Sequence, residues 1–302
     1  MRRSRSGSVL VHVPDHFRHF AAVDWSGAVG ERQKGIAVAI CTRGDDAPKL
    51  VRADERWSRA EVLDWMLGEM PPDTLIGFDL GPALPFADVG AFFPGWNESP
   101  ADARGLWALV DRLCAEDPHL SVASFVGHAE ASRYFRRQRE PLGDRFGTAP
   151  RGRMRLTELA QLRQGLSPVS NLNLVGAAQV GKSSLSGMRL LHRIQHHLPI
   201  WPFDAAPATG SLVVEIYTSI AALAAGRRVG RTKIKSITEL NQALAAIGSA
   251  PFPGSGAIDD HRSDALLTAA WLRAFAHRPE FWTPAGLDEE IARTEGWTFG
   301  VA

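Results

Sequence analysis

Short apolar runs, separated by turns rich in glycine and proline, predict the β-strands of this chain. The first run, residues 20–23, is apolar at every position, which is typical of a strand covered on both faces. The loop after it is short enough for a hairpin, whereas the fourth run must return beside the first by a crossover. This order predicts a mixed sheet, with strands at 20–23, 35–41, 49–53, 74–78 and 211–217.

Apolar positions spaced three to four residues apart predict the helices. Ser58 is a suitable N-cap for one of them, because Glu61 occupies the capping-box position three residues later. The segment 265–276 is so apolar that it must lie buried against the sheet. We expect a short edge strand at 295–301, and helices at 58–67, 102–114, 156–166, 219–225, 236–247 and 265–276.

Acidic residues stand near the ends of three predicted strands and at the start of the last long helix. Asp24, Asp79 and Glu215 belong to the strands, and Asp260 and Asp264 lie four residues apart, on one helix face. A single aspartate at such a position usually caps a turn. Several of them, converging above one edge of a sheet, would supply the oxygen ligands that a hard divalent cation requires.

Composition and charge restrict the classes of protein to which this chain belongs. Its 302 residues are 45% hydrophobic and 22% charged, an ordinary globular composition for one or two domains. The formal net charge of +1 argues against a protein whose whole surface binds a polyanion. Cys41 and Cys114 form neither a metal-ligand spacing nor a disulfide framework, so we expect a reducing, cytoplasmic compartment.

The N-terminal segment, residues 1–18, is predicted to be a disordered lead-in. It begins with several arginines, and its apolar run at 9–11 is too short for a signal peptide or a membrane span. We therefore expect no membrane partner. The oligomeric state cannot be inferred from the sequence.

A basic stretch and a glycine-rich segment offer two further candidates for phosphate contact. Residues 133–155 contain eight arginines, among them Arg136 and Arg137, and such a run is usually a solvated face, although arginine is also the preferred phosphate binder. Residues 176–183 match the P-loop pattern in full, with Lys182 and Ser183 in the phosphate-binding and magnesium-binding positions. The context argues against a P-loop, because only a weak strand pattern, 169–175, precedes it in mid-chain.

Five motifs, taken in order, resemble a domain-of-unknown-function family of predicted RNase H-like nucleases. They span nearly the whole chain, and the motifs are Val23-Asp24-Trp25-Ser26-Gly27, Ile76-Gly77-Phe78-Asp79-Leu80-Gly81, Val214-Glu215-Ile216-Tyr217, Asp260-x-x-x-Asp264-Ala265-Leu266 and Glu295-Gly296-Trp297-x-Phe299-Gly300.

The resemblance implies a single RNase H-like domain over residues 19–302. Its fold would be a five-stranded mixed sheet flanked by helices, with an insertion at about 86–205 between the fourth and fifth strands. The acids of such a site would be Asp24, Asp79 and either Asp264 or Asp260. Glu215 has no counterpart in the commonest arrangement.

We therefore expect a phosphodiester hydrolase that depends on Mg²⁺ or Mn²⁺, acting on nucleic acid or on a smaller phosphodiester. Carboxylates holding two metals roughly 3.5–4 Å apart need no nucleophilic side chain, and the sequence offers no convincing catalytic triad. One alternative is an ATP-using phosphotransferase with Lys182 as its phosphate ligand. Another is a non-catalytic scaffold that retains the acidic residues.

Overall fold

A computed structural model describes residues 13–147, 151–175, 180–228, 230 and 232–302. The prediction of a disordered lead-in falls outside these residues for 1–12, but it is wrong for 13–18. Phe17 is buried and stacks on Trp282, and the backbone NH of Arg18 donates to the carbonyl of Asp73.

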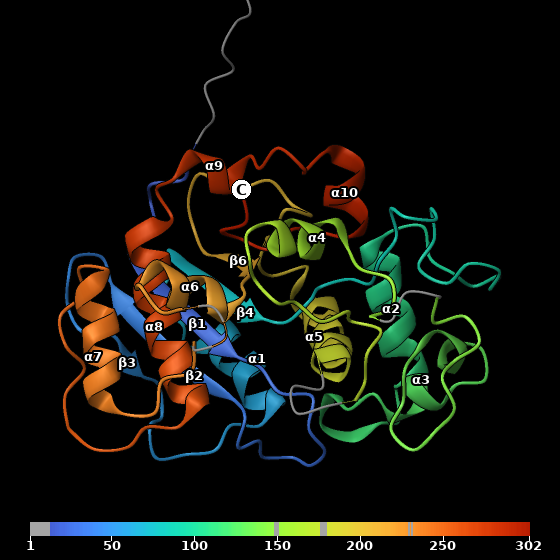
Figure 1. Cartoon of the computed structure of the whole chain (residues 1–302), viewed down its shortest axis with the longest axis horizontal. Helices are drawn as coiled ribbons and strands as arrows, with labels where there is room; N and C mark the ends of the chain where they lie inside the picture. Colours follow the sequence, from blue (N-terminus) through green and yellow to red (C-terminus); the bar gives the residue numbers. More distant parts are fainter. Residues whose placement is uncertain (1–12, 148–150, 176–179, 229, 231) are drawn as a thin grey trace, which may run out of the picture.

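The centre of the molecule is a mixed sheet of six strands in the order β3-β2-β1-β4-β6-β5 (Figure 1). As predicted, β1 pairs antiparallel with β2 and parallel with β4. β6 continues the parallel half of the sheet beside β4. The strands are β1 (His19–Asp24), β2 (Ala37–Thr42), β3 (Lys49–Leu50), β4 (Thr74–Asp79), β5 (Ile200–Trp201) and β6 (Leu212–Glu215).

Two details correct the expected sheet. The sixth strand, β5, lies within the segment predicted as an insertion, and it pairs parallel with β6. The predicted edge strand at 295–301 forms only a single bridge, Glu215 to Thr298, with the NH of Phe299 donating to the carbonyl of Glu215. Phe299 instead contacts Trp201 and Trp282, so aromatic packing holds this segment.

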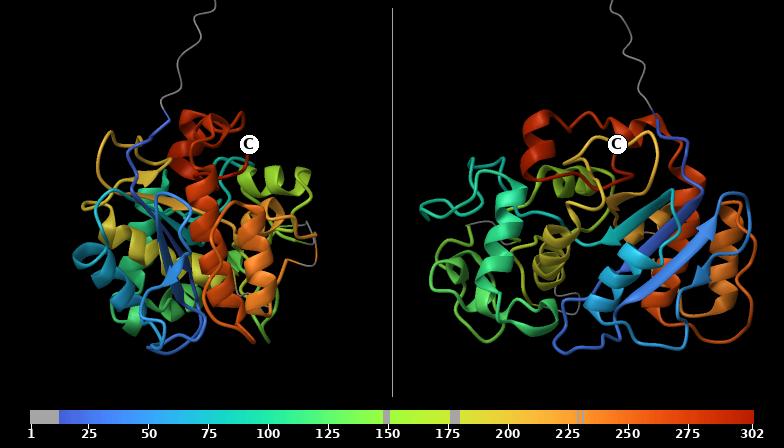
Figure 2. Two further views of the ribbon diagram at one scale, coloured as in Figure 1. Left: turned by 90° about the vertical axis from the view of Figure 1, so that its left-hand side faces the viewer. Right: turned by 180° about the vertical axis from the view of Figure 1, so that it is seen from behind.

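Alternate residues of the strands face two separate apolar cores, which explains why the strands are apolar throughout. Ala22, Leu75 and Val214 face one core, which is covered by α8 (Asp260–Phe275), α6 (Thr218–Ala224) and α7 (Ile237–Ala246). Figure 2 shows α7 and α8 in orange and red against this face. Val23 and Phe78 face the other core, which is covered by α1 (Arg59–Gly68), α2 (Ala103–Leu113) and α5 (Val180–Ile194).

The capping box at the start of α1 is confirmed. The hydroxyl of Ser58 accepts from the NH of Glu61 at 3.1 Å, and the NH of Ser58 donates to the Glu61 carboxylate at 2.7 Å. The helices predicted at 102–114, 156–166, 219–225 and 236–247 also form, each ending within a few residues of its expected bounds.

Much of the chain between β4 and β6 packs beside the sheet and not within it (Figure 1). It contains α2, α5 and, in addition, α3 (Ala123–Gly127), α4 (Leu156–Arg163) and two short 3₁₀ turns, Pro118–Leu120 and Ala131–Tyr134. After α8 the chain ends with α9 (Pro279–Trp282) and α10 (Glu289–Thr294). No helix in the described part of the chain is both long and apolar enough to cross a membrane.

Candidate active site

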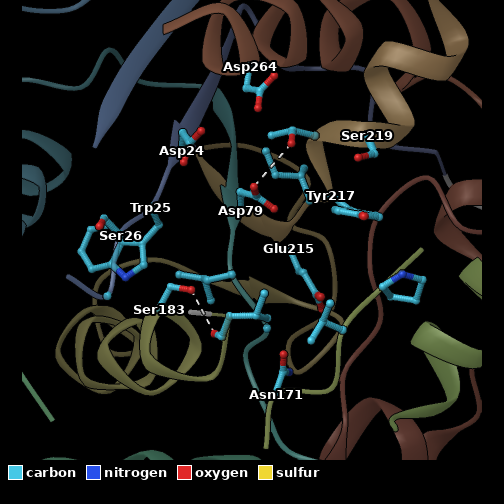
Figure 3. Close-up of a pocket in the computed structure, with 18 of the residues that line it drawn as sticks. Asp24, Trp25, Ser26, Asp79, Asn171, Ser183, Glu215, Tyr217, Ser219 and Asp264 are labelled. Carbon is cyan, nitrogen blue, oxygen red and sulfur yellow. Dashed lines mark hydrogen bonds between the residues drawn. The ribbon is translucent and has the colours of Figure 1, made fainter. Parts of the chain in front are cut away.

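Two aspartates end neighbouring strands in register. Asp24 is the last residue of β1 and Asp79 the last of β4, and the two are direct partners in the parallel ladder. Side chains of paired residues point to the same face of a sheet, here the face that α8 covers. The first two turns of α8 carry Asp264 to this position, so the three carboxylates line one pocket (Figure 3).

Burial and mutual repulsion disfavour the charged forms of these three carboxylates. Burial raises the pKa of Asp24, although the hydrogen bond with His261 opposes the rise. The pKa of Asp79 lies well above its ordinary value because of burial, and then because of the charges of Asp24 and Asp264. Burial also raises the pKa of Asp264 to about 6, even though Lys233 lies beside it.

Two basic side chains that the sequence analysis missed contact these acids. Nδ1 of His261 lies 3.3 Å from Oδ2 of Asp24, and Nζ of Lys233 lies 3.0 Å from Oδ2 of Asp264 and 3.6 Å from Oδ2 of Asp260. The adjacency of His261 to Asp260 was a usable signal, since both occupy the first turn of α8. Lys233 lies in a basic loop whose sequence does not indicate where it folds.

Of the three carboxylates, that of Asp79 has the fewest partners to stabilise its negative charge. Its only hydrogen bond within the described residues comes from the hydroxyl of Thr218, at 3.5 Å. Within the same residues, no three Asp, Glu, His or Cys side chains are arranged closely enough to enclose a metal ion. The donors are nevertheless of the right chemistry, because carboxylate oxygens are the ligands that a hard divalent cation takes.

Glu215, which was expected to be a metal ligand, does not lie on the same face of the sheet as Asp24 and Asp79. It pairs in the ladder with Phe78 and not with Asp79, so its side chain leaves the sheet on the opposite face. Arg155 donates to both of its carboxylate oxygens, at 2.5 and 3.0 Å, and the hydroxyl of Thr298 donates at 2.9 Å. Glu215 therefore lines the pocket, but its carboxylate is already hydrogen-bonded to Arg155 and Thr298. Asp260 is half-exposed and pairs only with Lys233 among the described residues.

The loops that follow the two aspartates dock against the insertion through glycines. A Cβ atom on Gly27 would overlap the backbone nitrogen of Ser183, at the start of α5. One on Gly81 would overlap the side-chain nitrogen of Asn171. Only a residue without a side chain allows these approaches. The insertion is thereby held against the ends of β1 and β4, where it forms one wall of the pocket.

The P-loop candidate does not have the expected context. Gly176 to Gln179 lie outside the described residues. Before them, 169–175 makes a single bridge, Arg136 to Asn173, and joins no strand of the sheet. Ser183 lines the pocket and its hydroxyl donates to the carbonyl of Val180, whereas Lys182 is not among the residues lining the pocket.

The arginine-rich stretch is largely engaged within the protein. Arg133 binds Asp144 and Glu130, Arg153 binds Asp88 and three backbone carbonyls, and Arg155 is buried with Glu158 and Glu215. Arg136 is exposed and Arg137 lies near Glu140, but neither lines the pocket. The two candidate phosphate-binding arginines are therefore not brought to the acids.

The pocket has a volume of about 720 Å³. Asp24 and Asp264 lie toward one end with Asp79 beside them, and Asn171 and Ser183 lie across from Asp264, with Tyr217 and Ser219 at the side (Figure 3). Comparison with family models, curated proteins and solved structures finds no match to this chain. The case for a function therefore depends on the chemistry of this pocket.

Proposed function

We propose that this pocket binds Mg²⁺ or Mn²⁺ and hydrolyses a phosphodiester. The observation that carries the proposal is the meeting of Asp24, Asp79 and Asp264, from β1, β4 and α8, in one pocket. Three carboxylates at raised pKa repel one another, and a bound divalent cation would relieve that repulsion. The resemblance of the motifs around these residues to predicted RNase H-like nucleases supports the same assignment.

Asp24, Asp79 and Asp264 would hold the cation. When bound, such a cation lowers the pKa of a water molecule and stabilises the leaving oxygen of the ester. The contact of His261 Nδ1 with Asp24 orients that carboxylate, and Lys233 supplies a positive charge at the edge of the acidic group.

The test is thermal denaturation with and without Mn²⁺ or Mg²⁺. At a hundredfold excess over the dissociation constant, metal should stabilise the folded protein by about 2.7 kcal/mol. The variant Asp79→Asn should leave the metal-free protein as stable or more stable, because it removes a repelled carboxyl, and should abolish both the metal response and hydrolysis of a panel of phosphodiesters.

Asp111→Asn is the matched control. Asp111 lies outside the pocket and pairs at 2.8 Å with the buried Arg189, so its replacement should lower stability and preserve the response to metal. If the unaltered protein shows no metal-dependent stabilisation, the proposal is wrong. The same conclusion follows if Asp79→Asn retains that stabilisation.

A further inference from the structure

We infer that the substrate is a small phosphodiester of about nucleotide size and not a nucleic acid polymer. The inference rests on the proposed function and concerns the same pocket, whose reaction it narrows to one class of substrate.

The insertion closes the pocket on one side. Ser167 to Val169, Asn171 and the first turn of α5 contribute its lining from the insertion, and Tyr217 to Ser219 contribute from the chain after β6. Figure 3 shows Asn171 and Ser183 across from Asp264, with Tyr217 and Ser219 at the side. The pocket volume of about 720 Å³ falls within the range of roughly 300–1,000 Å³ that small-molecule sites occupy. A phosphodiester with one sugar and one base, or a group of similar size, would fill it.

Away from the acids, the lining suits an uncharged organic group. Val169 is 39% exposed and presents apolar surface, while Ser219 and Tyr217 add hydroxyl groups. Binding of a polymer strand usually relies on a row of accessible aromatic rings on which successive bases stack. Here Trp25 is only 4% exposed and its Nε1 donates to Ser186, which leaves Tyr217 as the one partly exposed Phe, Tyr or Trp ring among the described lining residues.

The charge of the pocket does not suit a polyanion. Among the described residues, six acidic side chains line it against two basic ones, Arg155 and Lys233, apart from His261. Both basic groups are already paired with carboxylates. Arg133 and Arg153 are also paired with carboxylates elsewhere in the protein. A small diester brings one negative charge, which the bound metal can offset.

The experiment measures how fast the Mn²⁺-loaded protein hydrolyses a small diester and nucleic acid polymers. The small diester is the p-nitrophenyl ester of thymidine 5′-monophosphate, and the polymers are single- and double-stranded 20-nucleotide DNA and RNA. We expect at least a hundredfold higher kcat/KM for the small ester, changing less than twofold between 50 and 200 mM salt. Polymer binding through six or more phosphate contacts would instead weaken about a thousandfold or more over that range.

A variant of the wall provides a second readout. Val169→Trp should fill the apolar part of the pocket, raising KM for the small ester at least tenfold without altering Mn²⁺ affinity measured by calorimetry. Val89→Trp is the control, because Val89 is an exposed valine outside the pocket and its replacement should change neither quantity.

The outcomes separate the inference from the function on which it rests. Mn²⁺ binding together with preferred cleavage of a polymer, unaffected by Val169→Trp, would overturn the inference and preserve the hydrolase. Mn²⁺ binding without cleavage of any of these substrates would overturn the reaction and the substrate class together. Absence of Mn²⁺ binding would remove the metal site, and with it both proposals.

Discussion

Three chemically identical side chains occupy three different electrostatic environments in this pocket. Asp24 faces His261, Asp264 faces the ammonium group of Lys233, and Asp79 receives only a long hydrogen bond from Thr218 among the described residues. Because a buried carboxylate without a positive partner is the most costly to ionise, Asp79 should be the last of the three to lose its proton. A cation bound beside Asp79 would favour the ionised form of its carboxyl group.

The raised pKa of Asp264 predicts that the metal-free protein loses stability as the pH rises. The folded state keeps the proton up to a pH of about 6, whereas an ordinary aspartate releases it near 3.8. The folded state thus binds more protons in this window, so the free energy of unfolding falls as pH increases across it. A difference of about two pKa units corresponds to about 3 kcal/mol.

Urea denaturation of the unaltered protein and of Asp264→Asn, from about pH 4 to pH 7, measures this contribution. Relative to the unaltered protein, the variant should become progressively more stable as the pH rises, and the difference should level off above the folded pKa. Metal must be removed with a chelator, because a bound cation would keep the carboxylate ionised. Parallel stability profiles for the two proteins would contradict the prediction.

The helices and strands that could be predicted from the sequence are those long enough to show a clear hydrophobic pattern. β1, β4, α1 and α8 follow from apolar runs, helical periodicity and a capping box. β5 was missed because two residues carry no periodicity. The C-terminal aromatic segment was wrongly predicted as a strand, because residues with high β-propensity also serve to pack against a core.

In the candidate site, too, the residues that could be predicted are those attached to a recognisable strand. Asp24 and Asp79 could be found because each ends a recognisable strand. The face on which Glu215 lies depends on the register between β4 and β6, and a shift of one residue reverses it. Lys233 reaches the acids from a loop, so its place is set by tertiary packing that no local pattern encodes.

The close approach of the loop after β1 to α5 predicts a strong effect of Gly27→Ala. The added methyl group would overlap the backbone at Ser183 and force the wall of the pocket away from the sheet. We expect a lower melting temperature and weaker Mn²⁺ affinity, although no carboxylate is altered. Gly68→Ala is the control, because the methyl group added at the end of α1 would meet no atom within 4 Å beyond its chain neighbours and the backbone of its own helix, and this change should be neutral or slightly stabilising.

Calorimetric titration with Mn²⁺ and a thermal melt of each glycine variant check this expectation. Unchanged Mn²⁺ affinity in Gly27→Ala, with the fold retained, would show that the contact with α5 does not position the acids. A large loss of stability in Gly68→Ala would show that alanine substitution in this protein is harmful for reasons other than overlap.

At the scale of the whole molecule, one buried arginine joins three parts of the chain that are distant in sequence. Arg155, from the insertion, binds Glu215 at the end of β6 and the backbone carbonyl of Glu295 near the C-terminus. The Glu295 carboxylate in turn accepts from the NH groups of Phe86 and Leu156. Sheet, insertion and C-terminal segment are therefore connected through a single ionic network in the lining of the pocket.

Replacing Arg155 with leucine should destabilise the protein by about 3–5 kcal/mol, because Glu158 and Glu215 would remain buried without their positive partner. Urea denaturation gives the magnitude. The surface variant Arg112→Ala, which removes an exposed pair with Glu98, should change stability little. If Arg155→Leu and Arg112→Ala lower the free energy of unfolding by similar amounts, the ionic network does not hold these three parts of the chain together.

The two edges of the sheet have a consequence for association between molecules. β3 and β5, the outermost strands, are each only two residues long, and β3 begins with an exposed lysine. A long, flat edge would offer a ladder of unpaired backbone groups to a neighbouring chain, which is the usual starting point of intermolecular β-pairing. Edges this short provide almost no template, so a sheet buried on both faces is also protected along its sides.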